Sequence, residues 1–496
     1  MFKHHTAAPT SRRATLLVSL AFLLNSLIPV SLADDIPLPE IGAPSGNILT
    51  PAEERRLGQA FMRSIRNSMD VVSDPLMTAY IQSLGDRLAE NSETVGYNFQ
   101  FFIINDPIVN AFAGPGGHIG VYTGLITTTQ SENELASVLA HEMAHITQQH
   151  LVRRFDATKR MTLPAAGLTI AALVIGAASK NPDAAVMAAK GIQAGMLQHQ
   201  INFTRSNEEE ADHIGIKTLA AAGFNSRAMP TFFWRMGQAS RLYDSGKLPE
   251  FLRAHPVTSN RIADTHGRAD AYPYRQRAGS LEYHLLRAQL RAAEFEQPKE
   301  AIRFYRKSLE EGRFRNEDGQ RYGYVLALIS GREFAAAREQ IKRLRDKRPE
   351  QVDYIVALSL IEKGSNHPEA RLQTLREGLE IHPGSYMLSI YYARALLEQG
   401  KSQKARTLLE QQLVGRSDNA TLYKLLAQAA GDSGDKTSGH HYLAEFHYLS
   451  GAHKSAIQQL EIALRDRSMD YYTSARLTAR LKQIRQEQAD LKEHQR

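Results

Sequence analysis

Small residues recur at nearly constant intervals through the C-terminal part of the chain. They fall at Ala301, Ala336, Ala370, Ala405 and Gly439, which are 35, 34, 35 and 34 residues apart. Leucines follow three of them by eight residues, and glycines suited to turns stand between them at Gly331, Gly364, Gly400 and Gly434. A generic helical bundle would match this spacing only by chance. The four agreeing intervals therefore predict stacked helix–turn–helix units.

A period of 34 residues with paired helices is typical of tetratricopeptide repeats. We predict an all-α tetratricopeptide domain over residues 282–490. The length of 496 residues leaves room for a further domain before it. Residues 34–275 mix helical and strand patterns, so we expect a mostly α fold with a small sheet there.

The N-terminus has the pattern of a secretory signal peptide. Lys3, Arg12 and Arg13 precede a long apolar run, and the small residues Ser31 and Ala33 precede Asp34. This pattern predicts a signal peptide over residues 1–33 that is cleaved near Ala33. An uncleaved membrane anchor is the alternative, and the arginine pair leaves twin-arginine export open as well as the general route.

Cysteine is absent from the sequence, which excludes disulfides and thiolate metal ligands. A signal peptide without cysteine suits the bacterial periplasm, where we place the protein. The formal net charge is +7, without a dense basic stripe, so we expect no nucleic-acid partner.

Residues 97–126 read as strands that precede a helix. The run "YNFQFFIIND" is rich in β-forming residues, and the turn at Gly114–Gly117 divides the following apolar stretch into two short strands. Two helices are predicted before this sheet, one with Leu57, Phe61 and Ile65 on one face and one over 75–91. After the sheet, Ser131 and Glu134 are spaced as a capping box at the start of a helix.

That helix carries His141, Glu142 and His145 among apolar neighbours. Histidines four residues apart leave the same face of a helix, so both rings can reach one zinc ion. Glu142 lies beside them as a general base for water, which is the His-Glu-x-x-His pattern of zinc metalloproteases. A helix with two surface histidines is the alternative, but the apolar flanks argue against it.

A third ligand is required, and the sequence offers two regions for it. His150 follows His141 by nine residues, where the extended motif needs ten and a glycine, so we interpret it as a surface or outer histidine. Glu208 and Asp212 share one face of a later helix that Ser206 or Asn207 could cap. One carboxylate could bind metal while the other holds a ligand histidine.

The motif His141-Glu142-x-x-His145, followed by Glu208-x-x-Ala211-Asp212, resembles the gluzincin family of HtpX-type metallopeptidases. With the signal peptide and the repeats, the chain is similar to the periplasmic, BepA-type group of β-barrel assembly-enhancing proteases. The resemblance spans residue 34 to the end. It implies one Zn²⁺ per chain, with His141, His145 and Glu208 as ligands. It makes Glu142 the catalytic base and gives Asp212 a proton-donating or supporting role.

The same resemblance draws attention to "AHPVTSNRIAD", which contains His255 and Arg261. In this family the histidine is implicated in capping the zinc, which would close the water position and make the enzyme latent. A loop histidine without metal contact is the alternative. Arg261 could stabilise the oxyanion, or it could pair with a carboxylate.

Residues 162–179 form an Ala- and Gly-rich apolar run that contains Pro164. Its length favours a buried helix or helical hairpin over a membrane span, but peripheral membrane contact or a lid-like role stays open.

Taken as implied by the resemblance, the function is that of a periplasmic zinc endopeptidase with chaperone-like activity. Its clients would be unfolded or misassembled outer-membrane proteins, and its partners the β-barrel assembly machinery and the lipopolysaccharide-transport barrel. The rival hypothesis is a non-proteolytic chaperone or adaptor whose zinc site is structural or permanently capped. The presence of Glu142 argues against the rival, because a structural site needs no base.

Overall fold

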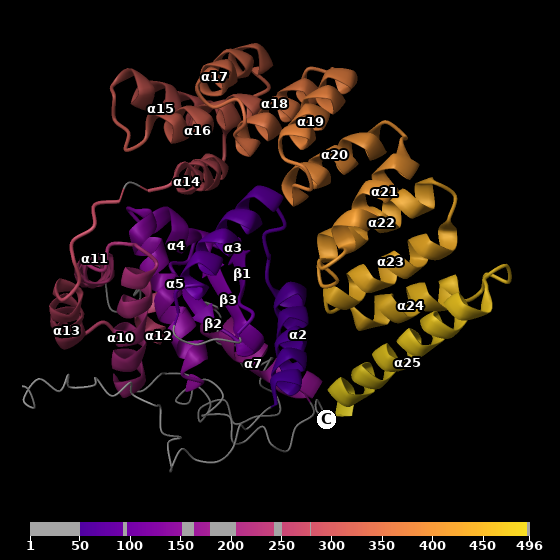
Figure 1. The fold of residues 1–496 in the computed structure, drawn as a ribbon, viewed down its shortest axis with the longest axis horizontal. Coiled ribbons are helices and arrows are strands. Elements are labelled where there is room, and N and C mark those ends of the chain that lie inside the picture. The colour runs from indigo at the N-terminus through magenta and orange to yellow at the C-terminus, as the bar shows by residue number, and fades with distance from the viewer. Residues whose placement is uncertain are drawn as a thin grey trace, which may run out of the picture. The chain divides into compact units, whose positions relative to one another are not determined.

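The structure is a computed structural model that describes residues 50–92, 97–150, 163–178, 205–242, 250–277 and 279–493 (Figure 1). The predicted signal peptide lies outside these residues. The backbone is mainly helical with one small sheet, so the prediction of a mostly α fold is confirmed.

The sheet has three strands, β1 (Gln100–Ile104), β2 (Ala111–Ala113) and β3 (His118–Tyr122), in the order β1-β3-β2. Strands β1 and β3 are parallel, and β2 runs antiparallel to β3. The predicted turn joins β2 to β3 through Gly116 and Gly117, whose φ angles of 71° and 82° disfavour side chains. The short strands predicted around this turn are confirmed.

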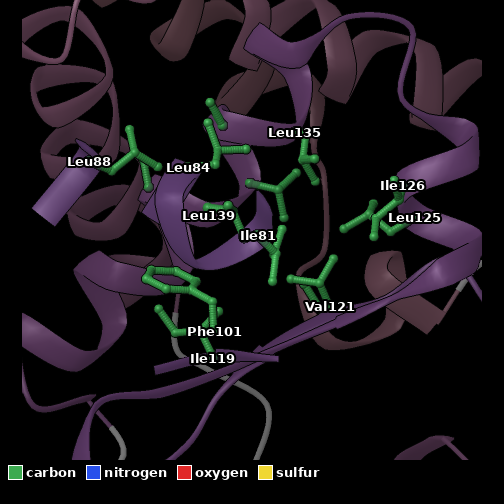
Figure 2. Packing of buried hydrophobic residues seen from close by; sticks show 14 of the residues in the cluster. Ile81, Leu84, Leu88, Phe101, Ile119, Val121, Leu125, Ile126, Leu135 and Leu139 are labelled. Atoms are coloured by element: carbon green, nitrogen blue, oxygen red, sulfur yellow. The ribbon is translucent and has the colours of Figure 1, made fainter. Parts of the chain in front are cut away.

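Two layers of helices cover the two faces of the sheet. Helices α3 (Pro75–Ala89) and α5 (Glu132–Thr147) pack on the face that presents Phe101, Ile119 and Val121 (Figure 2). Helices α2 (Pro51–Ser68) and α7 (Leu163–Ala178) pack on the face that presents Phe102 and Tyr122. Alternation along the strands therefore buries both faces, which fixes α5 against the sheet.

Helix α7 is the predicted apolar run, and it is a buried helix. Ala166, Ile170 and Ala171 belong to the cluster beneath α2. Gly167 allows a close approach, because a Cβ there would lie 2.7 Å from the Cβ of Ala60. Within the described residues, no helix combines the length and apolar character needed to cross a membrane. Peripheral membrane contact through 162–179 stays a prediction.

Five further helices complete the region before the repeats. They are α4 (Thr123–Thr128), α10 (Arg205–Ala221), α11 (Ala228–Leu242), α12 (Glu250–Ala254) and α13 (Ser259–Asp270). Helix α10 packs along α5, and α13 contacts α10 and α11. These contacts bring residues from four separate segments around the centre of α5.

The C-terminal part is an array of helical hairpins, as the periodicity predicted (Figure 1). Its helices are α14 (Leu281–Ala293), α15 (Pro298–Glu310), α16 (Glu317–Ser330), α17 (Phe334–Lys347), α18 (Val352–Gly364), α19 (Pro368–Ile381), α20 (Tyr386–Glu398), α21 (Ser402–Leu413), α22 (Ala420–Asp432), α23 (Lys436–Leu449), α24 (His453–Ala463) and α25 (Tyr471–Glu493). From α15 onward each helix packs on the next, and α14 packs on α16. Their apolar faces form three successive core clusters.

Two of the five recurring small residues lie one residue before the position that is buried in every unit. The fourth residue of the first helix is buried in each unit. In α15, α17, α19, α21 and α23 this residue is Ala301, Ala337, Arg371, Ala405 and Gly439. Ala336 and Ala370 precede these positions, and Ala370 is exposed. The unit from α15 to α17 is longer than the later units, which displaces the register. Arg371 replaces a small residue because its guanidinium pairs with Glu398 at 2.5 Å.

Side chains far apart in the chain join the repeats to the sheet-containing region. Tyr391 Oη donates to Asp74 Oδ2 at 2.9 Å, and Arg63 pairs with Glu487 of α25. The described residues from Thr50 onward belong to one compact unit. The domain boundary between 275 and 282 stays a prediction.

Candidate metal centre

Helix α5 supplies the first two candidate ligands. The Ser131 side chain caps the helix by accepting from the Glu134 backbone at 3.3 Å. A full capping box would also have the Glu134 carboxylate accept from the Ser131 backbone, and this half of the prediction is wrong. The carboxylate accepts from the Gln130 backbone instead and pairs with Arg235. His141 and His145 lie one turn apart on the buried side of α5, and their Nε2 atoms are 3.0 Å apart.

Helix α10 supplies the candidate carboxylate. Oε1 of Glu208 lies 3.5 Å from His145 Nε2, and Oε2 lies 3.6 Å from His141 Nε2. The close approach of the two helices depends on Gly215, where a Cβ would lie 3.2 Å from the backbone of His141. Arg205 is already helical, so Ser206 and Asn207 lie within α10, and the prediction that they cap it is wrong.

His255 follows α12 and enters the same cluster. The Phe251 backbone donates to Val109 O at 3.0 Å, which attaches α12 to the chain just before β2. Nδ1 of His255 lies 3.1 Å from Glu208 Oε1 and 3.3 Å from His141 Nε2. Its Nε2 lies 3.4 Å from Oε1 of Glu142. The imidazole of His255 thus stands between the candidate ligands and the candidate base.

The cluster fits a zinc ion by its donor set. One ligand atom from each of His141, His145, Glu208 and His255 lies within 4.8 Å of the others, and all four residues are buried. Three imidazoles and a carboxylate are donors that suit Zn²⁺. The four side chains converge from separate segments, so one cation could contact all of their donor atoms at once.

Glu142 is fully buried beside these residues. The Ala113 backbone and His255 Nε2, which lies 3.4 Å from Oε1, approach its carboxylate, but neither makes a hydrogen bond of ordinary geometry within the described residues. Burial raises the pKa of Glu142, while His255 and His141 act in the opposite direction. A buried carboxylate without hydrogen bonds is costly in a purely structural site, but it is ready to accept a proton from water.

A second layer of charged groups surrounds the candidate ligands. Asp212 Oδ1 lies 3.0 Å from His141 Nδ1. Arg261 donates to both oxygens of Asp212 at 2.8 Å, and its Nη1 lies 2.8 Å from Glu208 Oε2. Arg261 therefore adopts the alternative, carboxylate-pairing arrangement, and it is buried like the candidate ligands. Its role as an oxyanion stabiliser stays a prediction without support from this geometry.

His150 forms a comparable support for the other histidine. Its Nδ1 is 2.9 Å from His145 Nδ1, and its Nε2 is 2.9 Å from Glu210 Oε2. His150 is 1% exposed, so of the two interpretations the outer-histidine one is correct and the surface one is wrong. Glu210 is not among the site residues predicted from the sequence. Its position two residues after Glu208 was the only signal.

The surrounding charges favour the ligand forms of His145 and Glu208, and they favour a proton on His141 that a bound metal would displace. Burial acts to lower the pKa of His141. The hydrogen bonds and charges of Asp212 and Glu208 outweigh burial and raise this pKa to about 10. Burial, and after it the charge of His141, hold the pKa of His145 well below its usual value. Burial acts to raise the pKa of Glu208, but His255 and His141 outweigh it and hold that pKa well below its usual value. The carboxylates therefore stabilise a positive charge at this point, and a divalent cation would replace the proton.

A helix with paired histidines and a glutamate, a carboxylate from a second helix, and a small sheet together define a metallopeptidase of the zincin type. Residues 75–269 match the family model "Peptidase family M48".

Comparison with characterised proteins covers nearly the whole chain. The chain is 30% identical over 455 residues to the β-barrel assembly-enhancing protease of Escherichia coli K12, covering 92% of each chain. It is 30% identical over 478 residues to the Yersinia pestis protein of the same name, covering 94% of this chain and 97% of that one. The human mitochondrial metalloendopeptidase OMA1 is 27% identical over 209 residues, or 41% of this chain and 39% of that one.

The chain therefore belongs to the family of β-barrel assembly-enhancing proteases, and it is a zinc metallopeptidase of family M48.

Proposed function

We propose that this protein is a periplasmic zinc endopeptidase that degrades misfolded or stalled outer-membrane proteins and, with chaperone-like activity, promotes β-barrel assembly. The observation that carries the proposal is the juxtaposition of four buried ligand-type side chains with Glu142, whose carboxylate has no hydrogen-bond partner within the described residues.

In this proposal His141, His145 and Glu208 hold the ion. Zinc bound there supplies a Lewis acid that acidifies water and polarises a peptide carbonyl. Glu142 accepts the proton of the attacking water on its free carboxylate and delivers it to the nitrogen of the leaving amine. Burial of Glu142 supports this role, because it raises the pKa of the carboxyl group toward the range of an efficient proton carrier.

Asp212 and Arg261 act as positioning residues. Asp212 faces the ring nitrogen of His141 that points away from the other ligands, and Arg261 fixes the Asp212 carboxylate. Partners of this kind orient a ligand histidine and raise its basicity. Arg261 also balances the charge of Glu208, which leaves it poorly placed to reach a substrate oxyanion.

His255 makes the enzyme latent. Its ring occupies the space between the ligands and Glu142, with Nδ1 3.3 Å from His141 Nε2 and Nε2 3.4 Å from Glu142 Oε1. Water and a peptide carbonyl need this space. Release of α12 from Val109 would withdraw His255 and open the site.

The substrate lies along β2. This strand is at the edge of the described sheet, and α5 packs beside it, so an extended peptide added to β2 would pass close to Glu142. Recognition through the backbone suits an unfolded chain, because it does not depend on particular side chains.

The barrel-assembly role rests on the names of the relatives that match the chain along its length. It supports the proposal that the protein acts in the periplasm, and we propose that residues 1–33 are its signal peptide. The repeat array would present an extended surface to the β-barrel assembly machinery and to the lipopolysaccharide-transport barrel. The rival is a chaperone or adaptor with a permanently capped zinc site.

Glu142→Gln separates the two hypotheses. Wild type, Glu142→Gln and the control Glu209→Gln, which changes an exposed residue one position after Glu208, would be given an unfolded outer-membrane barrel protein. We expect proteolysis to fall by roughly 10²-fold or more in Glu142→Gln only, with zinc content retained. Equal cleavage by all three would refute the mechanism. Absence of cleavage by any of them, with barrel assembly still promoted, would favour the rival.

A further inference from the structure

A cavity separate from the metal centre lies where the first repeats meet α4. It has a volume of about 450 Å³ and is lined by α14, α15, α16 and the connection Arg313–Asn316, together with Thr127 of α4. Cavities of this size accept small ligands or a chain end, and are too small for a folded domain.

The cavity is lined by an excess of positive charge. Arg287, Arg291, Arg313 and Arg315 all contribute to its wall. Arg313 lies 3.3 Å from the carboxylate of Glu311. Among the ion pairs of the described residues, none involves the other three arginines. The wall therefore attracts an anion.

Two of these arginines also attach the repeats to the segment that leads into α5. Arg287 Nη2 donates to Thr127 O at 2.9 Å. Arg315 donates to the backbone oxygen of Gln130 and to the side-chain oxygen of the same residue. Gln130 directly precedes Ser131, the N-cap of α5. An occupant of the cavity would thus contact residues that fix the start of the helix with the metal ligands.

Two donors in the cavity wall have no partner. Nε of Arg287 and Nε2 of Gln320 are buried, and neither donates to an acceptor within the described residues. A buried donor without a partner costs about 1–3 kcal/mol, so rotation of either side chain toward a ligand oxygen in the cavity would be favoured.

Aromatic side chains complete the wall. Phe304 and Phe314 are 37% and 36% exposed, which is unusual for large apolar residues, and both line the cavity. The guanidinium of Arg291 lies 5.3 Å from the ring centre of Phe304. This combination suits a ligand with an anionic group attached to an aromatic or apolar body.

We propose that this cavity binds the C-terminal carboxylate of a polypeptide whose last residue is aromatic or large and apolar. Planar guanidinium and amide donors match the two oxygens of a carboxylate. Arg287 and Arg315 use some of their N–H groups on Thr127 and Gln130, and the donors that remain are offered to the ligand carboxylate, with phosphate as the competing anion in the test. The last side chain would rest against Phe304 and Phe314.

The test measures peptide binding and does not depend on proteolysis, so its outcome is independent of the proposed enzymatic function. A fluorescein-labelled hexapeptide ending in Leu-Phe with a free carboxylate would be titrated with full-length Glu142→Gln protein, which prevents cleavage of the probe. Fluorescence anisotropy reports the affinity. The same peptide with a C-terminal amide, and phenyl phosphate as a competitor, are the chemical controls.

Arg291→Gln and Gln320→Leu are the test variants. Arg303→Gln is the matched control, because Arg303 is an exposed arginine on α15 outside the cavity. We expect the amide peptide, Arg291→Gln and Gln320→Leu each to weaken binding at least tenfold, and Arg303→Gln to leave it unchanged. Equal affinity for acid and amide peptides would overturn the proposal. So would unchanged binding by Arg291→Gln and Gln320→Leu, or competition by phenyl phosphate that exceeds competition by the unlabelled peptide.

Discussion

Asp212 connects Arg261 to His141: the guanidinium donates to both Asp212 oxygens at 2.8 Å, and Oδ1 lies 3.0 Å from His141 Nδ1. All three groups are buried. This arrangement leaves His141 Nε2 as the nitrogen that faces the other ligands. The carboxylate therefore fixes both the orientation and the basicity of His141.

Removing the charge of Asp212 should weaken zinc binding. Asp212→Asn keeps the side-chain shape but loses the charge that faces His141, and we expect a loss of about 10- to 100-fold in zinc affinity. Competition with a chromogenic chelator measures this. Asp264→Asn, at an exposed position on α13, is the control. If both variants bind zinc as the wild type does, Asp212 has no positioning role.

Removing His255 should activate the peptidase. His255→Ala clears the ring that lies 3.4 Å from Glu142, so water and substrate gain access to the site. We expect faster cleavage of an unfolded protein, measured as initial rates with equal zinc loading. His266→Ala, which changes an exposed histidine on α13, is the control. A rate equal to that of the wild type would count against latency through His255.

Two glycine-to-alanine changes in neighbouring helices should have opposite effects. Gly267 has open space where a Cβ would lie, so Gly267→Ala should stabilise the protein by about 0.5–1 kcal/mol through helix propensity. At Gly215 the added Cβ would lie 3.0 Å from Met229 and 3.2 Å from the backbone of His141. The α5–α10 contact must then open.

For Gly215→Ala we therefore expect the propensity gain to be lost and zinc affinity to fall, while Gly267→Ala leaves zinc affinity unchanged. Urea unfolding and chelator competition measure the two quantities. A stabilised Gly215→Ala protein with normal zinc affinity would show that the helix spacing adapts without cost.

The contact between α2 and α25 should depend on pH through Glu487. Burial raises its pKa, but the hydrogen bond with His453 and the charge of Arg63 outweigh this and lower the pKa to about 2. A lowered folded-state pKa stabilises the fold above the unfolded pKa of about 4.3, and the contribution is lost as the pH falls toward 2.

We therefore expect Glu487→Gln to lower the free energy of unfolding by on the order of 3 kcal/mol at pH 7. The difference from the wild type should shrink between pH 5 and pH 2, as followed by urea unfolding. Glu461→Gln, which removes a more exposed pair with Arg485, should cost less than about 1 kcal/mol. A Glu487→Gln deficit that is constant with pH would mean that the carboxylate charge does not contribute.

The sequence by itself determined the features that follow from local backbone geometry. The spacing of His141 and His145 places both rings on one face of any helix, and the same holds for Glu208 and Asp212. Alternation and the glycine turn specified the strands of the sheet, and the periodicity specified the repeat array. In two units the recurring small residue lies one position before the buried one, because Ala336 precedes Ala337 and Ala370 precedes Arg371.

The tertiary structure decided everything that depends on which faces meet. Burial of His150, its link to Glu210, and the pairing of Arg261 with Asp212 require α5, α10 and α13 to pack together. The pairing of Arg63 with Glu487 joins residues 424 positions apart. Spacing along a chain encodes which side chains share a face, but the partner of that face is selected by packing and charge across the whole fold.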